Sequence, residues 1–372
     1  MKFSCDKNSL LTAVNKVIKG VTPRTTLPIL QGILIKAYEN NIKMYSTDLE
    51  IGIECTLEAN IESWGNIVVS AKVFSELIRK FPEDIVYFES DDNNIINIKC
   101  GASNFTISGS NSEEFPEITE IIKEKSLVIK ANILKDMLRK TSFCTAQEQT
   151  RPILTGILFE INKNQINMVA LDGYRMALTK YFSEDIVLNN TEKNDFNIVI
   201  PGTTVDELTK IIDDDEKYIN IFFTNNQVLF EMDNTKLISR LLEGNYMNYN
   251  AVLPKDFKTI VKVNKQMLIG GIERASLLAS GKNNLIKFTI NDNELIISSN
   301  SDIGKMFEKL QIELEGMLLE IAFNSRYLLE ALKLIDEEEI NLCFINNINP
   351  MIITPVGNDN YLYMILPVKL NN

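Results

Sequence analysis

The chain of 372 residues contains no histidine. Because Ser-His-Asp and Cys-His nucleophile pairs both need an imidazole base, these catalytic arrangements are excluded, and so are metal sites built on histidine. The sequence also lacks a GxxxxGK(S/T) phosphate loop and a GxGxxG fingerprint following a strand. We therefore expect no catalytic centre of these kinds, no metal and no cofactor.

Paired cysteines and long apolar runs are missing as well. The five cysteines are scattered and no CxxC pair occurs, which disfavours a zinc ribbon or a redox dithiol. They fit buried or half-buried thiols in a reducing cytoplasm. No run of about 18 apolar residues is present, and the sequence MKFSCDKNSL at the start lacks the features of a secretory signal. The expected location is the cytoplasm, with no membrane partner.

An internal repeat is the most informative positive feature. Thr26–Ile35 (TLPILQGILI) returns as Thr150–Phe159 (TRPILTGILF), with seven of ten positions identical. The offset is 124 residues, one third of the chain, and it also carries Asp48 to Asp172. Solenoid repeats are only about 20–50 residues long, so a period of this size indicates a duplicated domain. The chain is therefore predicted to hold three copies of one domain.

Each copy is predicted to contain two helices and a set of antiparallel strands. Apolar residues recur at helical spacing, and runs with period-two alternation lie between the helical segments. The expected helices are Asn8–Lys19, Ala71–Phe81, Asn132–Thr141, Thr203–Ile212, Asn264–Leu278 and Ser325–Ile335. The predicted fold class is α+β, with three tandem copies of a two-helix, antiparallel-sheet domain of roughly eight strands. Polar connectors place the domains at 1–125, 126–255 and 256–372.

Charge is distributed unevenly along the chain. The net charge is −12, which alone argues against a nucleic-acid partner. However, the first helix of each copy with its flanks, at 7–24, 130–143 and 262–282, holds twelve basic residues against only Asp136 and Glu273. These segments sum to +10 and the remainder to −22. A single charged helix face is usually only solvated, but its recurrence in three copies indicates a shared basic surface that meets phosphates without reading bases.

Two acidic runs, Asp213–Glu216 and Glu337–Glu339, are the remaining candidates for chemistry. They could hold Mg²⁺ for a nuclease reaction. Each run follows a helical segment and precedes a strand, where a solvated turn is expected. The solvated turn is the favoured interpretation.

Three copies of such a domain, each with one basic helix and an acidic remainder, resemble the bacterial sliding clamp, the beta subunit of DNA polymerase III. The most specific motifs are Thr26–Leu30, Leu171–Met176 and Tyr361–Leu370, and the resemblance covers the whole chain. It implies the DNA clamp fold and a head-to-tail homodimer, with six domains per ring around duplex DNA. It also implies a processivity subunit without catalysis, which tethers the polymerase III catalytic subunit, the clamp loader and repair proteins through short linear peptides.

The resemblance further implies an apolar cleft between the second and third domains, where these peptides dock. Arg175 is expected at its edge, with the guanidinium group in water and the aliphatic stem on the apolar floor. Tyr174 occupies a site that is often histidine in the family, so the peptide preference stays open. The residues carried over to the cleft are Leu154, Leu171, Tyr174, Arg175, Met176, Met247, Val252, Met351, Met364, Leu366, Pro367 and Val368.

Two further surfaces are implied. Phe105 and Ile107 match the first domain's side of the dimer interface, and Leu277 and Leu278 match the third domain's side. For DNA, the resemblance points to Arg24 in a loop, and the basic helices with their flanks add Lys16, Lys19, Arg139, Lys140 and Lys282.

Three hypotheses are therefore compared: a DNA-tethering ring without catalysis, a Mg²⁺-dependent nuclease using Asp213–Glu216, and a scaffold of three repeats that does not bind DNA. The missing histidine and the solvated setting of the acidic run weigh against the nuclease. The basic helices weigh against the scaffold. The ring is the preferred hypothesis.

Overall fold

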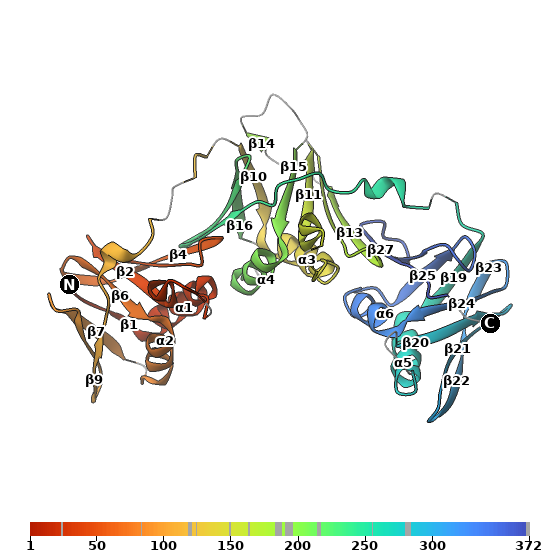
Figure 1. Ribbon diagram of the computed structural model, residues 1–372, viewed down its shortest axis with the longest axis horizontal. Helices are drawn as coiled ribbons and strands as arrows, with labels where there is room; N and C mark the ends of the chain where they lie inside the picture. The colour runs from red at the N-terminus through yellow and green to blue at the C-terminus, as the bar shows by residue number, and fades with distance from the viewer. Residues whose placement is uncertain are drawn as a thin grey trace. The chain divides into compact units, whose positions relative to one another are not determined.

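The computed structural model is shown in Figure 1 and divides into two compact units. It describes residues 1–372 except 24, 83, 118–120, 124, 149, 163, 183–187, 190–195, 214–216, 255, 280–283 and 370–372. Unit 1 comprises 1–132, 187–192 and 206–241, and unit 2 comprises 133–186, 193–205 and 242–372. The division passes through α3 (Ala131–Ser142) and α4 (Gly202–Ile211).

Unit 1 contains two antiparallel sheets. The larger has the strand order β14-β10-β16-β17-β18-β4-β3-β2-β6, and the smaller has the order β5-β1-β7-β8-β9. Helices α1 (Lys7–Val17) and α2 (Ala71–Lys80) pack against each other and contact β4 and β6 respectively. The strands are β1 (Lys2–Asp6), β2 (Gly32–Tyr38), β3 (Asn41–Thr47), β4 (Ile51–Glu58), β5 (Asn60–Ser63), β6 (Gly65–Ser70), β7 (Ile85–Ser90), β8 (Ile95–Cys100), β9 (Ser103–Ser108), β10 (Lys125–Lys130), β14 (Leu188–Asn189), β16 (Tyr218–Phe223), β17 (Gln227–Met232) and β18 (Thr235–Arg240).

Unit 2 repeats this plan. Its larger sheet has the order β15-β11-β12-β13-β27-β26-β25-β19-β23, and its smaller sheet has the order β22-β21-β20-β24. Helices α5 (Lys265–Ser276) and α6 (Ser325–Leu332) pack against each other, and α5 also contacts β21 and β22. The strands are β11 (Gly156–Asn162), β12 (Gln165–Leu171), β13 (Arg175–Phe182), β15 (Phe196–Pro201), β19 (Thr259–Asn264), β20 (Leu285–Ile290), β21 (Glu294–Ser301), β22 (Gly304–Gln311), β23 (Glu313–Gly316), β24 (Leu319–Asn324), β25 (Glu339–Phe344), β26 (Met351–Pro355) and β27 (Tyr361–Ile365).

Local chemistry explains where the helices begin. The side chain of Asp6 accepts the backbone N–H of Ser9 at 2.8 Å, so it caps α1. Asn264 caps α5 in the same way, through the N–H of Met267 at 3.0 Å. The apolar face of α1 is then buried at helical spacing, through Leu10, Ala13, Val14 and Val17.

Each nine-stranded sheet combines strands from two successive copies of the repeat, and one antiparallel strand pair joins the two copies. In unit 1, β4 pairs antiparallel with β18, and Gly52 lies opposite Ile238. In unit 2, β13 pairs antiparallel with β27, and Met176 lies opposite Met364. Strands β4 and β13 have the same place in successive copies, and so do β18 and β27. These two pairings are termed the strand junctions of units 1 and 2.

The predicted fold class is confirmed. The described residues contain the six expected helices, each within a few residues of its expected bounds. They contain twenty-seven strands, nine to a copy, which is one more per copy than expected. The short outer strands β5, β14 and β23 have only two to four residues, too few to show a period-two pattern in the sequence.

Candidate functional site

A tight turn between β12 and β13 forms one corner of a cleft in unit 2. The Oδ1 atom of Asp172 accepts the backbone N–H groups of Tyr174 at 2.9 Å and Arg175 at 3.0 Å. Gly173 has φ +93°, a left-handed conformation that glycine adopts without steric cost. The backbone oxygen of Tyr174 accepts the N–H of Leu366 at 2.9 Å. The turn and the segment after β27 are therefore held together.

The cleft has a volume of about 330 Å³, within the roughly 300–1,000 Å³ of typical ligand pockets. Its floor is buried and apolar, and its rim is open to solvent: the Tyr174 side chain, for example, is 64 % exposed. Methionines on the floor and rim can adapt to different apolar partners. The lining residues are Leu171, Gly173, Tyr174, Arg175, Met176, Met247, Val252, Pro350, Met364 and Leu366.

Eight of the twelve residues predicted for the cleft line it, and four lie elsewhere. Leu154 belongs to the buried core cluster that also contains the cleft floor. Met351 is fully buried in β26. Pro367 and Val368 are half-buried after β27, and the N–H of Val368 donates to the backbone oxygen of Ala322 at 2.8 Å.

Two lining residues, Gly173 and Pro350, were missed by the sequence analysis. Gly173 lies inside the quoted motif Leu171–Met176, and its position before a strand was an available signal. Pro350 lines the cleft, whereas its neighbour Met351, which was predicted to line it, is buried in β26. A one-residue error at a strand end therefore replaced a lining residue with a core residue.

The prediction that the Arg175 guanidinium lies in water is wrong, because the residue is only 8 % exposed. It donates to the Asp172 carboxylate at 2.9 Å, to the Phe143 backbone oxygen at 2.9 Å and to the Glu330 carboxylate. The Tyr327 ring lies 4.3 Å from the guanidinium carbon. Glu330 and Tyr327 belong to α6, more than 150 residues away in sequence, so no local pattern reveals these contacts. Arg175 anchors the cleft wall to α6.

Glu330 is the acidic partner in this network. Burial raises its pKa, but hydrogen bonds from Arg326 and Arg175 outweigh burial and hold the pKa below its ordinary value. Glu330 is therefore ionised at neutral pH and balances the buried guanidinium charge.

The basic first helices meet carboxylates from distant segments. Lys16 is the tenth residue of α1 and pairs with Asp213 at 3.2 Å. Lys140 is the tenth residue of α3 and pairs with Asp336 at 2.7 Å. Arg274 holds the tenth place in α5 and pairs with a glutamate of β22 instead. The sequence-based charge sum omitted these carboxylates, because they lie outside the helical segments. The basic surfaces are therefore less positive than the sum of +10 implies.

Arg139 and Lys140 share two carboxylates. Lys140 also contacts Asp136 at 2.7 Å, and Arg139 contacts Asp136 at 3.0 Å and Asp336 at 3.6 Å. Burial lowers the pKa of Lys140, but the hydrogen bonds to Asp136 and Asp336 outweigh it, so the pKa is raised. Lys140 therefore stays charged at every physiological pH.

The other residues predicted to bind DNA fall into two groups. Lys19 is half-buried in the short 3-10 helix Ile18–Gly20, and within the described part of the chain it makes no ion pair. Arg24 and Lys282 lie outside the described residues.

The four residues predicted for the dimer interface lie on or beside outer elements of their units. Phe105 is an exposed residue of β9, and its ring centre lies 5.6 Å from that of Phe81. Ile107, on the same strand, is half-buried. Leu277 follows α5 and is 79 % exposed, and Leu278 is half-buried. Strand β9 is the outermost of its sheet, and β22, which contacts α5, is the outermost of another.

Family models of the DNA polymerase III beta subunit match three consecutive stretches: the N-terminal domain at 1–119, the central domain at 128–248 and the C-terminal domain at 250–369. The chain belongs to the DNA polymerase III beta subunit family. A beta sliding clamp of Bacillus subtilis is 36 % identical over 381 residues, covering 99 % of this chain and 100 % of the relative. One of Staphylococcus aureus is 34 % identical over 380 residues, covering 99 % of each chain.

Solved structures agree with this assignment. The crystal structure of the DNA polymerase sliding clamp of Bacillus subtilis matches the whole of both chains with a TM-score of 0.94 at 34 % identity. This member of the beta subunit family is a sliding clamp of DNA replication, acting as a dimer on DNA with polymerase partners. It is a processivity factor and not an enzyme, so the nuclease and scaffold hypotheses are set aside. Among the described residues, no helix combines the length and hydrophobicity needed to cross a bilayer.

Proposed function

We propose that the cleft of unit 2 is the docking site for short linear peptides of the polymerase III catalytic subunit, the clamp loader and repair proteins. The observation that carries the proposal is that eight of the twelve residues implied by the resemblance line one apolar cleft. A buried floor below an exposed apolar rim suits a peptide that inserts a few apolar side chains. Binding should depend mainly on those side chains, with charges at the rim secondary.

The test is the double variant Met364→Ala plus Leu366→Ala, which removes one floor and one rim side chain. Affinity for a polymerase-derived peptide should fall at least about tenfold, or roughly 1.4 kcal/mol. The matched control is Met317→Ala plus Leu318→Ala, which truncates two exposed residues outside the cleft. Melting of both variants checks the fold. Full affinity in a folded cleft variant would place the docking surface elsewhere.

We further propose that Lys16, Lys19, Arg24, Arg139, Lys140 and Lys282 belong to the surface that meets DNA. The recurrence of a basic helix in every copy supports this. Phosphates would compete with Asp213 and Asp336 for Lys16 and Lys140. Such a surface holds DNA weakly at any one point and independently of base sequence, as a sliding ring requires.

We also propose that the dimer closes where Phe105 and Ile107 of one protomer meet Leu277 and Leu278 of the partner subunit. The repeat supports this placement. Strand β22 has the place in its copy that β4 and β13 have in theirs, and β9 has the place of β18 and β27. An antiparallel β22–β9 pair between subunits would form a third strand junction like those within each unit.

The domains of this ring are proposed at 1–125, 126–255 and 256–372, giving six in the dimer, and the proposed location is the cytoplasm. The boundaries rest on the 124-residue period and the polar connectors. The boundary after residue 255 falls between β18 and β19, whereas the boundary after residue 125 falls behind the first residue of β10.

A further inference from the structure

A second groove lies at the strand junction of unit 1. It has a volume of about 220 Å³ and is smaller than the cleft in unit 2, whose volume is about 330 Å³. Its role does not depend on the function proposed for that cleft. Its lining residues are Thr47, Leu49, Glu50, Ile51, Gly52, Pro116, Glu117, Gln227, Ile238 and Arg240.

Strand register makes this groove the counterpart of the cleft. Thr47 lies opposite Gly52 just as Leu171 lies opposite Met176. The pairing of β18 with β4 and β17 extends the same equivalence to Ile238, Arg240 and Gln227. The eight equivalent pairs are Thr47 and Leu171, Leu49 and Gly173, Glu50 and Tyr174, Ile51 and Arg175, Gly52 and Met176, Gln227 and Pro350, Ile238 and Met364, and Arg240 and Leu366.

The backbone of the groove is held as firmly as that of the cleft. The Oδ1 atom of Asp48 accepts the N–H groups of Glu50 at 2.9 Å and Ile51 at 2.7 Å, as Asp172 does in unit 2. The N–H of Arg240 donates to the backbone oxygen of Glu50 at 3.0 Å, as that of Leu366 does to Tyr174. The groove is therefore a preformed frame with different side chains.

Leu49 is the unusual residue of this frame. It has φ +80°, where the equivalent Gly173 has φ +93°. The left-handed region is unfavourable for a residue with a Cβ atom, and glycine would relieve it. The chain nevertheless has leucine at position 49, and this side chain is 46 % exposed on the groove wall. An apolar side chain held on the surface at a conformational cost points to a binding role.

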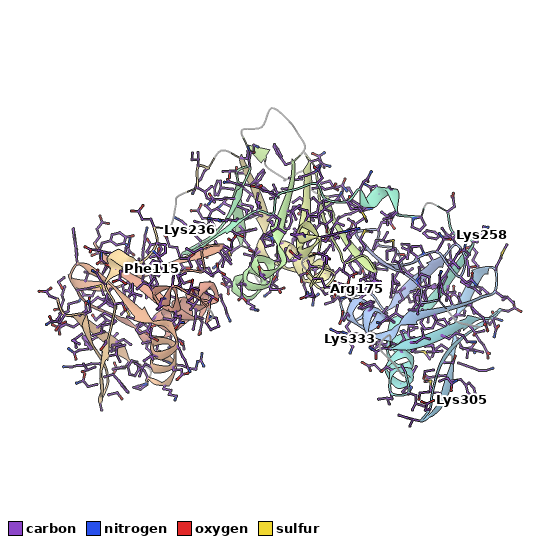
Figure 2. All side chains as sticks on the ribbon, viewed as in Figure 1. Phe115, Arg175, Lys236, Lys258, Lys305 and Lys333 are labelled. Carbon is purple, nitrogen blue, oxygen red and sulfur yellow. The ribbon has the colours of Figure 1, made fainter. Side chains whose placement is uncertain are left out.

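The charges of the groove favour a cationic ligand. Glu50 and Glu117 are both exposed carboxylates on its lining. Arg240 approaches Glu50 at 3.5 Å, whereas Glu117 has no ion-pair partner among the residues that the structure describes. The buried Phe115 anchors the connector that carries Glu117 (Figure 2). The lining thus holds two carboxylates and one guanidinium, so the groove keeps an acidic excess.

We propose that this groove binds an extended, basic peptide segment. A lysine or arginine of the peptide meets Glu50 and Glu117, and a neighbouring apolar side chain packs on Leu49 and Ile238. The combination of an apolar wall with carboxylates distinguishes such a peptide from a small cation, which needs only the charges, and from the apolar peptides suited to the cleft of unit 2.

The experiment uses the full-length dimer and a blocked hexapeptide of alternating lysine and leucine, with a glutamate–leucine hexapeptide for comparison. Methyl NMR locates the peptide and titration gives its affinity. The lysine peptide should shift the methyl signals of Leu49 and Ile238, and the glutamate peptide should bind at least about tenfold more weakly. Leu49→Gly, which relieves the backbone conformation, should fold normally and lose at least about tenfold in affinity.

The matched control is Asn94→Gly, which also removes a side chain at positive φ but lies outside the groove. It should bind the lysine peptide as the unaltered protein does. Glu50→Gln plus Glu117→Gln should lower the affinity for the lysine peptide and should also reduce the dependence of that affinity on salt. The proposal is overturned if Leu49→Gly binds the lysine peptide with full affinity or if neither peptide binds. It is also overturned if spermidine shifts the same methyl signals as strongly as the peptide, or if only the signals of Leu171 and Leu366 respond. The last result would report on the cleft of unit 2, so the two sites are tested separately.

Discussion

The two strand junctions share a backbone and differ in almost every side chain that faces solvent. In unit 2, the turn after β12 carries Gly173 and Tyr174, and in unit 1 the turn after β3 carries Leu49 and Glu50. An aspartate organises both turns through the same two N–H groups. The repeated fold therefore supplies a groove at each junction, and side chains alone decide whether that groove is apolar or acidic.

The junctions also differ below the surface. Arg175 brings a buried guanidinium that needs Asp172 and Glu330, whereas the equivalent Ile51 of unit 1 is apolar and needs no such partner. Each unit nevertheless has a lysine of a first helix paired with an aspartate that follows a second helix, Lys16 with Asp213 in unit 1 and the equivalent pair in unit 2. Ion pairs between a first helix and a distant loop thus occur in both units, whereas the contacts of Arg175 with Asp172 and Glu330 occur only beside the apolar cleft of unit 2.

The proposed junction between subunits gives the strongest test of this comparison. Leu277→Ala plus Leu278→Ala should remove apolar packing of about 2–5 kcal/mol for each side chain buried in the interface. Because two such interfaces close the ring, sedimentation should show monomers. Asp213→Asn plus Asp336→Asn, which alters only ion pairs within a chain, should remain a dimer. An unaltered dimer in the leucine variant would refute the assignment.

Glu330→Ala should destabilise the protein next most, because it leaves the buried Arg175 guanidinium short of an acceptor. Breaking a buried ion pair costs about 3–5 kcal/mol, and because the Glu330 carboxylate is partly exposed, the expected loss is about 3 kcal/mol. Denaturant unfolding measures it. Glu117→Ala, at an exposed position in unit 1, should change stability by less than about 0.5 kcal/mol. Equal effects of the two substitutions would contradict the anchoring role.

Exchanging the turn residues tests the shared frame. Gly173→Leu places a Cβ atom at φ +93° and should cost about 1–2 kcal/mol. Leu49→Gly removes a similar conformational cost from the folded state. Glycine also stabilises the unfolded chain by about 0.5–1 kcal/mol through its greater backbone entropy, so the net effect on stability should be small. Thermal melting of both variants compares them. An unchanged melting temperature in Gly173→Leu would contradict the claim that leucine at this left-handed position costs stability.

DNA affinity should respond in opposite directions to two substitutions. Lys19→Ala should weaken binding equally on unrelated duplexes and lower the salt slope by about one unit at most. Asp336→Asn should strengthen binding, because Lys140 then loses a competitor for phosphate. The measurement is a salt series on two duplexes of different sequence. A loss confined to one duplex would contradict binding through the backbone alone.

Lowering the pH should have the smallest effect on stability among these tests, and it should act through two carboxylates of unit 2. Hydrogen bonds from Lys140 hold the pKa of Asp336 below its ordinary value, and the pKa of Glu330 is also lowered. Their contribution is therefore complete above the unfolded pKa values of about 3.9 and 4.3, and it is lost as pH falls through the folded values. Glu330→Gln should reduce the acid-induced drop in melting temperature by a few degrees. An identical pH profile would exclude this carboxylate as a contributor.

The sequence predicted the regular parts of this structure better than its contacts. Helices such as Ala71–Phe81 and Thr203–Ile212 have strong periodicity, and they were found close to their expected bounds. The environment of Arg175 was wrong, because Glu330 is brought to it only by the packing of α6. The partners of Lys16 and Lys140 were missed for the same reason, since each pair joins residues almost 200 positions apart. Periodicity is local information, whereas ion pairing depends on the folded arrangement.

The repeat within one polypeptide has a consequence for how the grooves can change. A ring made from six identical single-copy chains would carry one groove chemistry six times over, and any substitution would appear at every junction. With three copies fused in one chain, each groove is encoded separately. A substitution at Leu49 leaves Gly173 untouched, so mutation can give one groove a new preference while the other keeps its own.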